Sequence, residues 1–254
     1  MGAAFARYCA AQGRPHVVLT RANYAEHVGQ SCEVFINANG NSRKYLAREQ
    51  PLAEFDASVR SARASLQDFR AGCYVHLSSC DVYPDTTSPA ATREEAALDP
   101  GRQSPYGFLK HLAELCVRHA APSWLILRLG GFVGPGLKKN PIFDILHGGP
   151  LWLDPASELQ YLHTDAGARL IMGLVERGLR DEIVNVCGAG LIRLQDVIAL
   201  VGRPVPVQPG SPRVRYDISI EKLSGYAAVP ETRAAVLDFV RGQLAAAAGP
   251  GEAA

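Results

Sequence analysis

The sequence predicts an α/β fold built on a parallel sheet with helices on both of its faces. Two observations carry this prediction: helical patterns alternate with short apolar runs, and those runs do not alternate with polar residues. A strand that is buried on both faces needs apolar side chains on both, whereas a half-exposed strand alternates. The chain has 254 residues, 47% of them apolar and 20% charged, which is enough for one such domain with a small addition.

The individual elements follow from local patterns. β-branched and apolar runs predict strands at 16–20, 34–38, 74–78, 124–129 and 183–186. Apolar residues at helical spacing predict helices at 3–12, 51–69, 105–120, 166–177 and 193–201. Gly13 is expected to end the first helix, and the low-complexity tail from Gln243 is expected to be frayed.

Composition argues against several classes of protein. The formal net charge of +1 provides no global field to recruit nucleic acid or a membrane surface. The six cysteines are scattered without a C-x-x-C pair, which favours reduced thiols over disulfides or zinc, and no other metal-ligand spacing is present. Arg128 interrupts the best candidate for a membrane span, which needs about 18 apolar residues. We therefore expect a cytoplasmic protein without metal, nucleic-acid or membrane partners.

Tyr106 and Lys110 form the first candidate for chemistry. They stand at i and i+4 of a predicted helix, so the phenol and the ammonium share one helix face. A nearby cation favours phenolate and lowers the tyrosine pKa from about 10, which suits a general acid/base. A short pattern of this kind also arises on ordinary surface helices, and that alternative stays open.

Ser79 is the second candidate. It closes the run Y-V-H-L-S-S, and functional groups in a parallel sheet lie at the carboxyl ends of strands. A strand-end serine with a helix-borne tyrosine and lysine suits hydride chemistry at a carbinol. The alternative for Ser79 is a hydroxyl that only forms a turn. His76, in the same strand, is expected to be a core histidine with satisfied hydrogen bonds.

Three strings in this order resemble a known family. S-S-C-D-V-Y, S-P-Y-G-F-L-K and L-R-L-G-G-F-V-G-P-G are similar to S-S/T-x-x-V-Y-G, S-x-Y-x-x-x-K and R-x-x-N-x-x-G-P. These are motifs of the extended short-chain dehydrogenases/reductases, the NAD-dependent epimerase/dehydratase family. The strings E-V-F-I-N-A-N-G upstream and I-V-N-V-C-G downstream also resemble strands of that family.

The resemblance implies a Rossmann-like doubly wound parallel sheet at 1–135, a small mixed substrate-binding part at 136–242 and a flexible tail at 243–254. It implies an NAD(P)-dependent enzyme that acts on a hydroxyl or ketone of a sugar nucleotide or a sugar-like intermediate. Tyr106 would be the acid/base, Lys110 would tune it and hold the nicotinamide ribose, and Ser79 would polarise the reacting oxygen. Ala38 and Asn39 would run past the cofactor. A homodimer through the helices at 51–69 and 105–120 is also implied.

The start of the sequence departs from the family pattern. Gly2 resembles the third glycine of the family's G-x-x-G-x-x-G turn, which holds the cofactor pyrophosphate. The family's first strand and the two earlier glycines of that turn are not found before Gly2 in this sequence. We expect the true start roughly a dozen residues upstream of Met1, the length of that strand and turn. The alternative is a shortened protein without a cofactor that binds a ligand or partner without turnover.

Other departures bear on specificity. Arg21 stands where an acidic residue would bind a ribose 2′-hydroxyl, which slightly favours NADP, although a solvated arginine is an equal alternative. Lys138 and Lys139 are candidate phosphate contacts, or simply solvated. Asp81 is a candidate substrate contact. Because Cys80-Asp81 replaces the Asp-Glu pair typical of dehydratases, an epimerase or reductase is expected instead.

Overall fold

A four-stranded parallel sheet forms the centre of the protein. The computed structural model describes residues 1–40 and 44–247. The strand order is β1-β2-β3-β7, all neighbours being parallel, as the sequence predicts. The strands are β1 (Ser31–Asn37), β2 (Arg70–Ser79), β3 (Trp124–Leu129) and β7 (Glu182–Val186).

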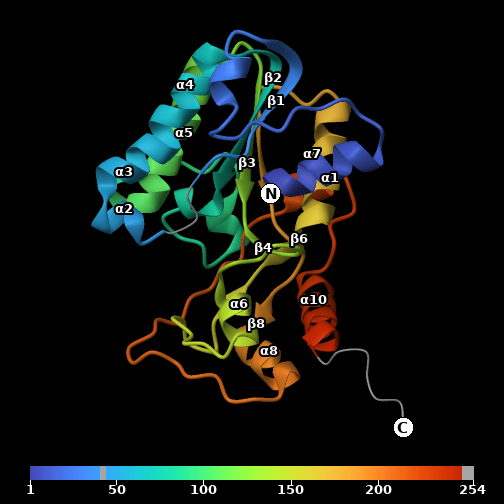
Figure 1. The fold of residues 1–254 in the computed structure, drawn as a ribbon. Coiled ribbons are helices and arrows are strands. Elements are labelled where there is room, and N and C mark those ends of the chain that lie inside the picture. Colours follow the sequence, from blue (N-terminus) through green and yellow to red (C-terminus); the bar gives the residue numbers. More distant parts are fainter. Residues whose placement is uncertain (41–43, 248–254) are drawn as a thin grey trace.

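Helices cover both faces of this sheet (Figure 1). One face carries α4 (Ser61–Asp68) and α5 (Pro105–Ala120), and the other carries α1 (Gly2–Ala11) and α7 (Thr164–Glu176). Side chains of β2 alternate between the two layers, so Val75 packs with Phe5 of α1 while Tyr74 packs with Val117 of α5. The predicted α/β architecture, with apolar residues on both faces of the strands, is confirmed.

The helix predicted at 51–69 is present with one irregular turn. It consists of α3 (Pro51–Phe55), the π-helical turn η2 (Asp56–Arg60) and α4, and the short α2 (Leu46–Glu49) leads into it. All of these segments pack against α5. A π-helical turn interrupts the regular i→i+4 ladder and re-aims the side chains around it.

A second group of elements lies beyond the carboxyl edge of the sheet (Figure 1). Two small sheets are formed by β4 (Gly131–Val133) with β6 (Tyr161–His163) and by β5 (Glu158–Leu159) with β8 (Ile192–Arg193). The helices α6 (Pro141–Leu146), α8 (Leu194–Val201) and α10 (Thr232–Ala247) complete this group, and α9 (Glu221–Ser224) contacts β7. The group has its own apolar core, which includes Val133, Ile145, Leu159, Val197 and Val236.

Two sequence-based expectations are wrong. Residues 16–20 form no strand, and Val17 and Val18 are 62% and 53% exposed. A strand needs a neighbour for its backbone N–H and C=O groups, and no described strand pairs with this run. The tail is helical through Ala247 because alanine has the highest helix propensity and Leu244 packs on the second core. The remaining tail, 248–254, lies outside the described residues.

A buried ion pair fixes α5 to the sheet. Arg128 of β3 donates to Glu114 of α5, with Nη2 2.9 Å from Oε2, and the two side chains are 3% and 2% exposed. Arg128 also donates to the hydroxyl of Tyr83 at 2.9 Å, and Tyr83 donates to Asn185 at 2.8 Å. Buried charges are tolerated only when they are paired and hydrogen-bonded. This network therefore sets where α5, and the residues it carries, lie above β2 and β3.

Candidate active site

Ser79 lies where β2 ends and the short helix η3 (Cys80–Val82) begins. Its oxygen accepts a hydrogen bond from the backbone N–H of Asp81 at 3.2 Å, and its hydroxyl donates to Asp81 Oδ2 at 2.8 Å. The side chain is 9% exposed. The predicted strand-end serine is therefore held rigidly, with its hydroxyl tied to a carboxylate.

The first turn of α5 brings Tyr106 against Ser79. Ser104 caps the helix by accepting from the backbone N–H of Gly107 at 3.1 Å, and Pro105 occupies the first helical position. A β-carbon at Gly107 would lie 2.0 Å from the carbonyl oxygen of Asp81, so only glycine permits this approach. Ser79 is close enough to the Tyr106 hydroxyl to lower the pKa of that phenol, against the larger effect of burial.

Lys110 completes the cluster one helical turn later. Its Nζ lies 5.7 Å from the centroid of the Tyr106 ring, and the residue is 4% exposed. A β-carbon at Gly40 would lie 2.8 Å from this Nζ, so the ammonium lies against the turn that follows β1. Burial lowers the pKa of Lys110, and the carboxylates of Glu54 and Glu114 oppose that shift. The structure thus brings Ser79, Tyr106 and Lys110 together.

The pKa of Tyr106 does not follow the sequence-based expectation. Burial raises it above its ordinary value, and the Asp81 carboxylate adds to the shift because phenolate is disfavoured without water and beside a negative charge. Lys44 opposes the shift, whereas Lys110 lies over the ring. The expectation that the pKa of Tyr106 lies below its ordinary value is therefore wrong.

Lys44 and Tyr216 belong to the site although sequence analysis missed both. Lys44 Nζ lies 2.7 Å from Asp81 Oδ2, and the Tyr216 hydroxyl donates to Asp81 Oδ1 at 2.7 Å. The Lys44 ammonium also lies 5.0 Å from the centroid of the Tyr216 ring. Neither residue belongs to a recognisable motif, since 172 positions separate them and only folding brings them together.

The residues proposed for the cofactor lie near the same edge of the sheet, with one exception. Gly2 begins α1, whose N-terminus has no side-chain cap, and a β-carbon there would lie 3.6 Å from the Ala38 side chain. Asn39 follows in the turn, where its N–H donates to the Asn37 side chain at 3.0 Å. Arg21 is the exception because no contact ties it to this edge: it is exposed in a turn and pairs with no described residue.

These residues fit the dinucleotide that the sequence resemblance implies. The Lys110 ammonium beside Gly40 offers a donor for ribose hydroxyls, and the uncapped N-terminus of α1 beside the small Ala38 leaves backbone room for a phosphate group. The first two glycines of the family turn do not belong to the sequence given, so this fit covers only the groups named here.

The three residues proposed to contact the substrate differ in their surroundings. Lys138 is exposed and Lys139 half-buried in the loop between β4 and α6. Asp81 is 10% exposed and already holds three partners. Among the described residues, no three His, Cys, Asp or Glu side chains are placed to hold a metal ion.

His76 is buried as expected, but its hydrogen bonds are not satisfied. It is 2% exposed in the middle of β2, and neither ring nitrogen has a partner among the described residues. Burial, together with the Lys110 charge, lowers its pKa to about 3. The side chain is therefore neutral at physiological pH.

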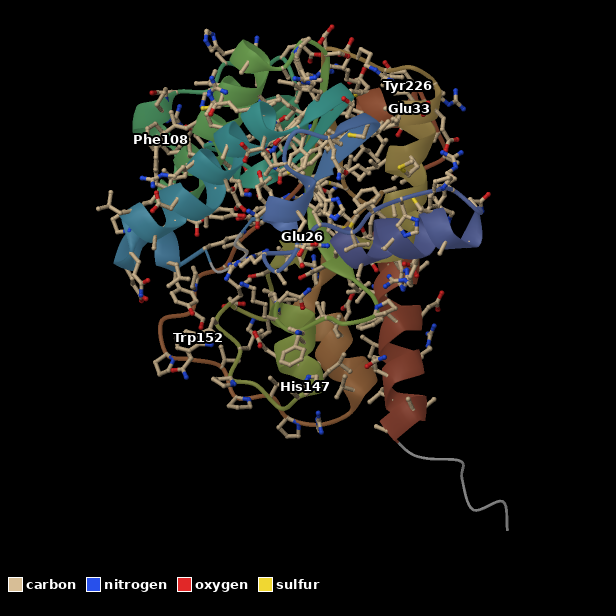
Figure 2. The ribbon with its side chains drawn as sticks, turned by 45° about the horizontal axis from the view of Figure 1, so that its top comes forward. Glu26, Glu33, Phe108, His147, Trp152 and Tyr226 are labelled. Atoms are coloured by element: carbon tan, nitrogen blue, oxygen red, sulfur yellow. The ribbon has the colours of Figure 1, made fainter. Side chains whose placement is uncertain are left out.

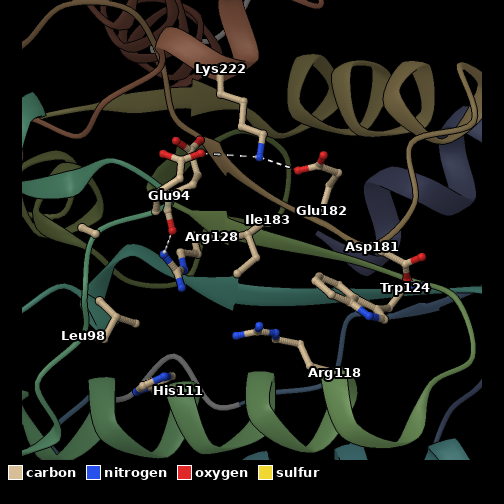
Figure 3. Close-up of a pocket in the computed structure, with 12 residues that line it drawn as sticks. Glu94, Leu98, His111, Arg118, Trp124, Arg128, Asp181, Glu182, Ile183 and Lys222 are labelled. Carbon is tan, nitrogen blue, oxygen red and sulfur yellow. Dashed lines mark hydrogen bonds and ion pairs between the residues drawn. The ribbon is translucent and has the colours of Figure 1, made fainter.

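A groove of about 420 Å³ lies elsewhere, at the amino ends of β3 and β7 (Figure 3). Trp124, Arg118 and Glu182 line it, and Lys222 pairs with Glu182 at 2.5 Å. Trp124 and Glu182 lie at the amino ends of these parallel strands, opposite Ser79, and Arg128 lines the groove nearer to the carboxyl end of β3. It contains none of the residues described above for the candidate site.

Comparison with known proteins identifies the family. Residues 1–187 match the profile of the NAD dependent epimerase/dehydratase family. The chain belongs to this family. The family assignment from the three sequence strings is thereby confirmed. No curated protein matches the sequence.

Solved structures similar to this family member share its fold. A UDP-galactose 4-epimerase is 20% identical with a TM-score of 0.69, over 88% of this chain and 81% of that one. MoeE5 in complex with UDP-glucuronic acid and NAD is 16% identical with a TM-score of 0.73, over 95% of both chains. RMD from Pseudomonas aeruginosa, complexed with NADPH, is 19% identical with a TM-score of 0.65, over 82% of this chain and 81% of that one.

No helix among residues 1–40 and 44–247 is long and apolar enough to cross a membrane.

Proposed function

We propose that the protein is an NAD(P)-dependent oxidoreductase or epimerase that acts on a hydroxyl or ketone of a sugar nucleotide or a sugar-like intermediate. The observation that carries this proposal is the cluster of Ser79, Tyr106 and Lys110 at the carboxyl edge of the sheet, where Ser79 acts on the Tyr106 phenol and the Lys110 ammonium lies 5.7 Å from the centre of its ring. Family membership and MoeE5, solved with a sugar nucleotide and NAD, support it.

Each residue of the cluster has a distinct role in this proposal. A nicotinamide, when bound, would supply the hydride chemistry that interconverts a carbinol and a ketone. Tyr106, as phenolate, accepts the proton of the substrate hydroxyl when the alcohol is oxidised, and gives it back when the ketone is reduced. Ser79 holds the reacting oxygen by a hydrogen bond, for which its hydroxyl turns from Asp81 to the substrate. Lys110 binds the ribose hydroxyls next to Gly40.

The finer assignments are proposals as well. Gly2, Ala38 and Asn39 border the cofactor, and Arg21, if it binds a 2′-phosphate, gives a slight preference for NADP. Asp81, Lys138 and Lys139 contact the substrate, which lies between the sheet-bearing part at 1–135 and the part at 136–242. The protein forms a homodimer through α3, η2, α4 and α5, where Phe108 and Leu115 are 37% and 44% exposed.

Substitution of Tyr106 tests the function. Tyr106→Phe should lower turnover of a UDP-sugar at least about 100-fold, the contribution of a general acid/base, while NADH or NADPH still binds. Binding is measured by fluorescence on the natural full-length protein, and turnover by absorbance of the reduced nicotinamide or by chromatography of the sugar nucleotide. Unchanged turnover contradicts the role of Tyr106. Failure of wild type to bind either dinucleotide favours a ligand-binding protein without redox chemistry.

A further inference from the structure

Two cysteine side chains meet directly behind the candidate active site. Cys80 follows Ser79 at the end of β2, and Cys187 follows the last residue of β7. Their Sγ atoms lie 3.5 Å apart, and the two residues are 1% and 0% exposed. Both thiols are free, and no other pair of cysteine sulfurs is in contact among the described residues. The proposed reaction gives neither thiol a task.

The end of β3 makes room for this contact. In the sheet β3 lies between β2 and β7, and Gly130 directly follows it. A β-carbon at Gly130 would lie 2.6 Å from Cys187 Sγ, so a larger residue there would push this sulfur from its place. The Cys80 thiol donates to the backbone carbonyl oxygen of Arg128 in β3 at 3.3 Å. The two thiols are therefore held against each other over the end of β3.

We propose that Cys80 and Cys187 are a modification site, a dithiol that hydrogen peroxide converts to a disulfide, and that this bond moves Ser79 away from Tyr106. The effect on Ser79 rests on the proposed function, whereas the bond itself does not. One thiol is oxidised to a sulfenic acid while peroxide releases a first water. The second thiol then attacks that sulfur and a second water leaves. The two thiols lose two electrons and two protons, and these reduce one peroxide to two waters.

Burial makes the reaction slow and directs its product. Burial raises the pKa of Cys80, and the neighbouring Cys187 and Asp81 add to the shift, so this thiol is protonated at neutral pH. Peroxide reaches the pair when η3 opens locally. A sulfenic acid formed on either sulfur has the other thiol 3.5 Å away, so it is captured as a disulfide before it meets a second peroxide. The exposed Cys32 has no such neighbour and is oxidised further.

Formation of the bond has to displace η3. The two sulfurs of a disulfide are about 2.05 Å apart, so those of Cys80 and Cys187 must approach by roughly 1.5 Å. Cys80 stands between Ser79 and Asp81, which move with it. Helix α5 stays in place because its Glu114 is paired with Arg128 of β3. A displacement of about 1 Å can cost a reaction about 100-fold, so we expect turnover to fall by about 10- to 100-fold.

Peptide mapping of the peroxide-treated protein tests the site. The folded full chain is incubated with hydrogen peroxide, its remaining thiols are blocked with N-ethylmaleimide in urea, and it is digested without reductant. Trypsin leaves Cys73 and Cys80 on one peptide, and chymotrypsin separates them after Tyr74. Mass spectrometry should show the Cys80 peptide joined to the Cys187 peptide. Cys32 should carry added oxygen and be joined to neither.

Two variants complete the test. Cys187→Ala should abolish the joined peptide. Cys73→Ala is the matched control, because Cys73 is also 0% exposed but has no sulfur neighbour, and this variant should form the joined peptide as wild type does. Turnover of a UDP-sugar should fall in peroxide-treated wild type and return with dithiothreitol, whereas Cys187→Ala should show no loss that dithiothreitol reverses. Circular dichroism verifies folding, and Cys187→Ser replaces Cys187→Ala if the latter is unfolded.

Three results would overturn the inference. The first is the absence of the joined peptide at a peroxide dose that fully oxidises Cys32, and the second is a joined peptide that forms only in unfolded protein. The third is full turnover of completely joined protein, which would remove the effect on Ser79. The joined peptide is detected without turnover. A reduced protein that is inactive would therefore contradict the proposed function and still allow the disulfide to be judged.

Discussion

His76 shows how one buried side chain can make stability depend on pH. Its pKa in the folded protein is about 3, against about 6.5 in an unfolded chain. Between these values the unfolded chain binds a proton that the folded protein does not, so stability falls as pH falls through this window. The limit for one group is about 1.4 kcal/mol per pH unit.

We expect His76→Leu to remove this part of the pH dependence. Urea unfolding at pH 7.5, 6 and 5 should show wild type losing stability relative to the variant by up to about 1.4 kcal/mol for each unit below pH 6.5. His119→Leu, at an exposed position on α5, serves as control and should run parallel to wild type. A constant difference between wild type and His76→Leu would contradict the shifted pKa.

At the scale of single residues, the sequence predicts those site residues that belong to a motif. It misses the residues that reach the site only when the chain folds. Ser79, Tyr106 and Lys110 were predictable because a strand end and an i,i+4 pair are local patterns. Lys44 and Tyr216 were not, since 172 positions separate them. The predicted direction of the Tyr106 pKa shift was wrong for the same reason. The shift depends on burial and on the Asp81 carboxylate, and both arise only when the chain folds.

At the scale of elements, the contact between α5 and η3 determines whether Tyr106 can reach Ser79. Gly107→Ala would bring a β-carbon to within 2.0 Å of the Asp81 carbonyl oxygen, a backbone atom that cannot rotate away. We expect a loss of about 1–3 kcal/mol in the free energy of unfolding, the range for overpacked sites, and lower turnover because α5 must move away from η3.

Gly173→Ala is the matched control for this substitution. Gly173 lies in α7, and a β-carbon there meets no atom within 4 Å. Since alanine favours a helix over glycine, this variant should gain up to about 1 kcal/mol with unchanged turnover. Equal stability of the two variants, measured by urea unfolding, would show that the approach of α5 to η3 is not tight.

The elements themselves were predictable where their own residues specify them. Helix 105–120 and strand 124–129 match α5 and β3, because an amphipathic face and a doubly buried apolar run are properties of one segment. The run at 16–20 has strand propensity yet forms no strand, since pairing depends on a partner. The π-helical turn η2 has no local signature in this sequence, and it interrupts a helix that was otherwise predicted.

At the scale of the whole molecule, the proposed homodimer is open to a direct test. Phe108 points away from the molecule on the outer side of α5 (Figure 2). Leu115 of α5 and Leu52 of α3 are 44% and 80% exposed. Light scattering after gel filtration should give twice the mass of the chain for wild type, and Phe108→Glu should give a monomer. Trp152→Glu, at an aromatic residue 65% exposed on the second group of elements, should remain dimeric. A monomeric wild type would refute the proposal.

The carboxylate of Asp81 also constrains how related sequences can diverge. A neutral residue in place of Lys44 would leave an uncompensated charge in a mostly buried position, and loss of Asp81 would release both Lys44 and Tyr216. Substitutions at these three positions should therefore be inherited together rather than singly. An alignment of orthologous proteins would then show them as a covarying trio, linking the first quarter of the chain to its last.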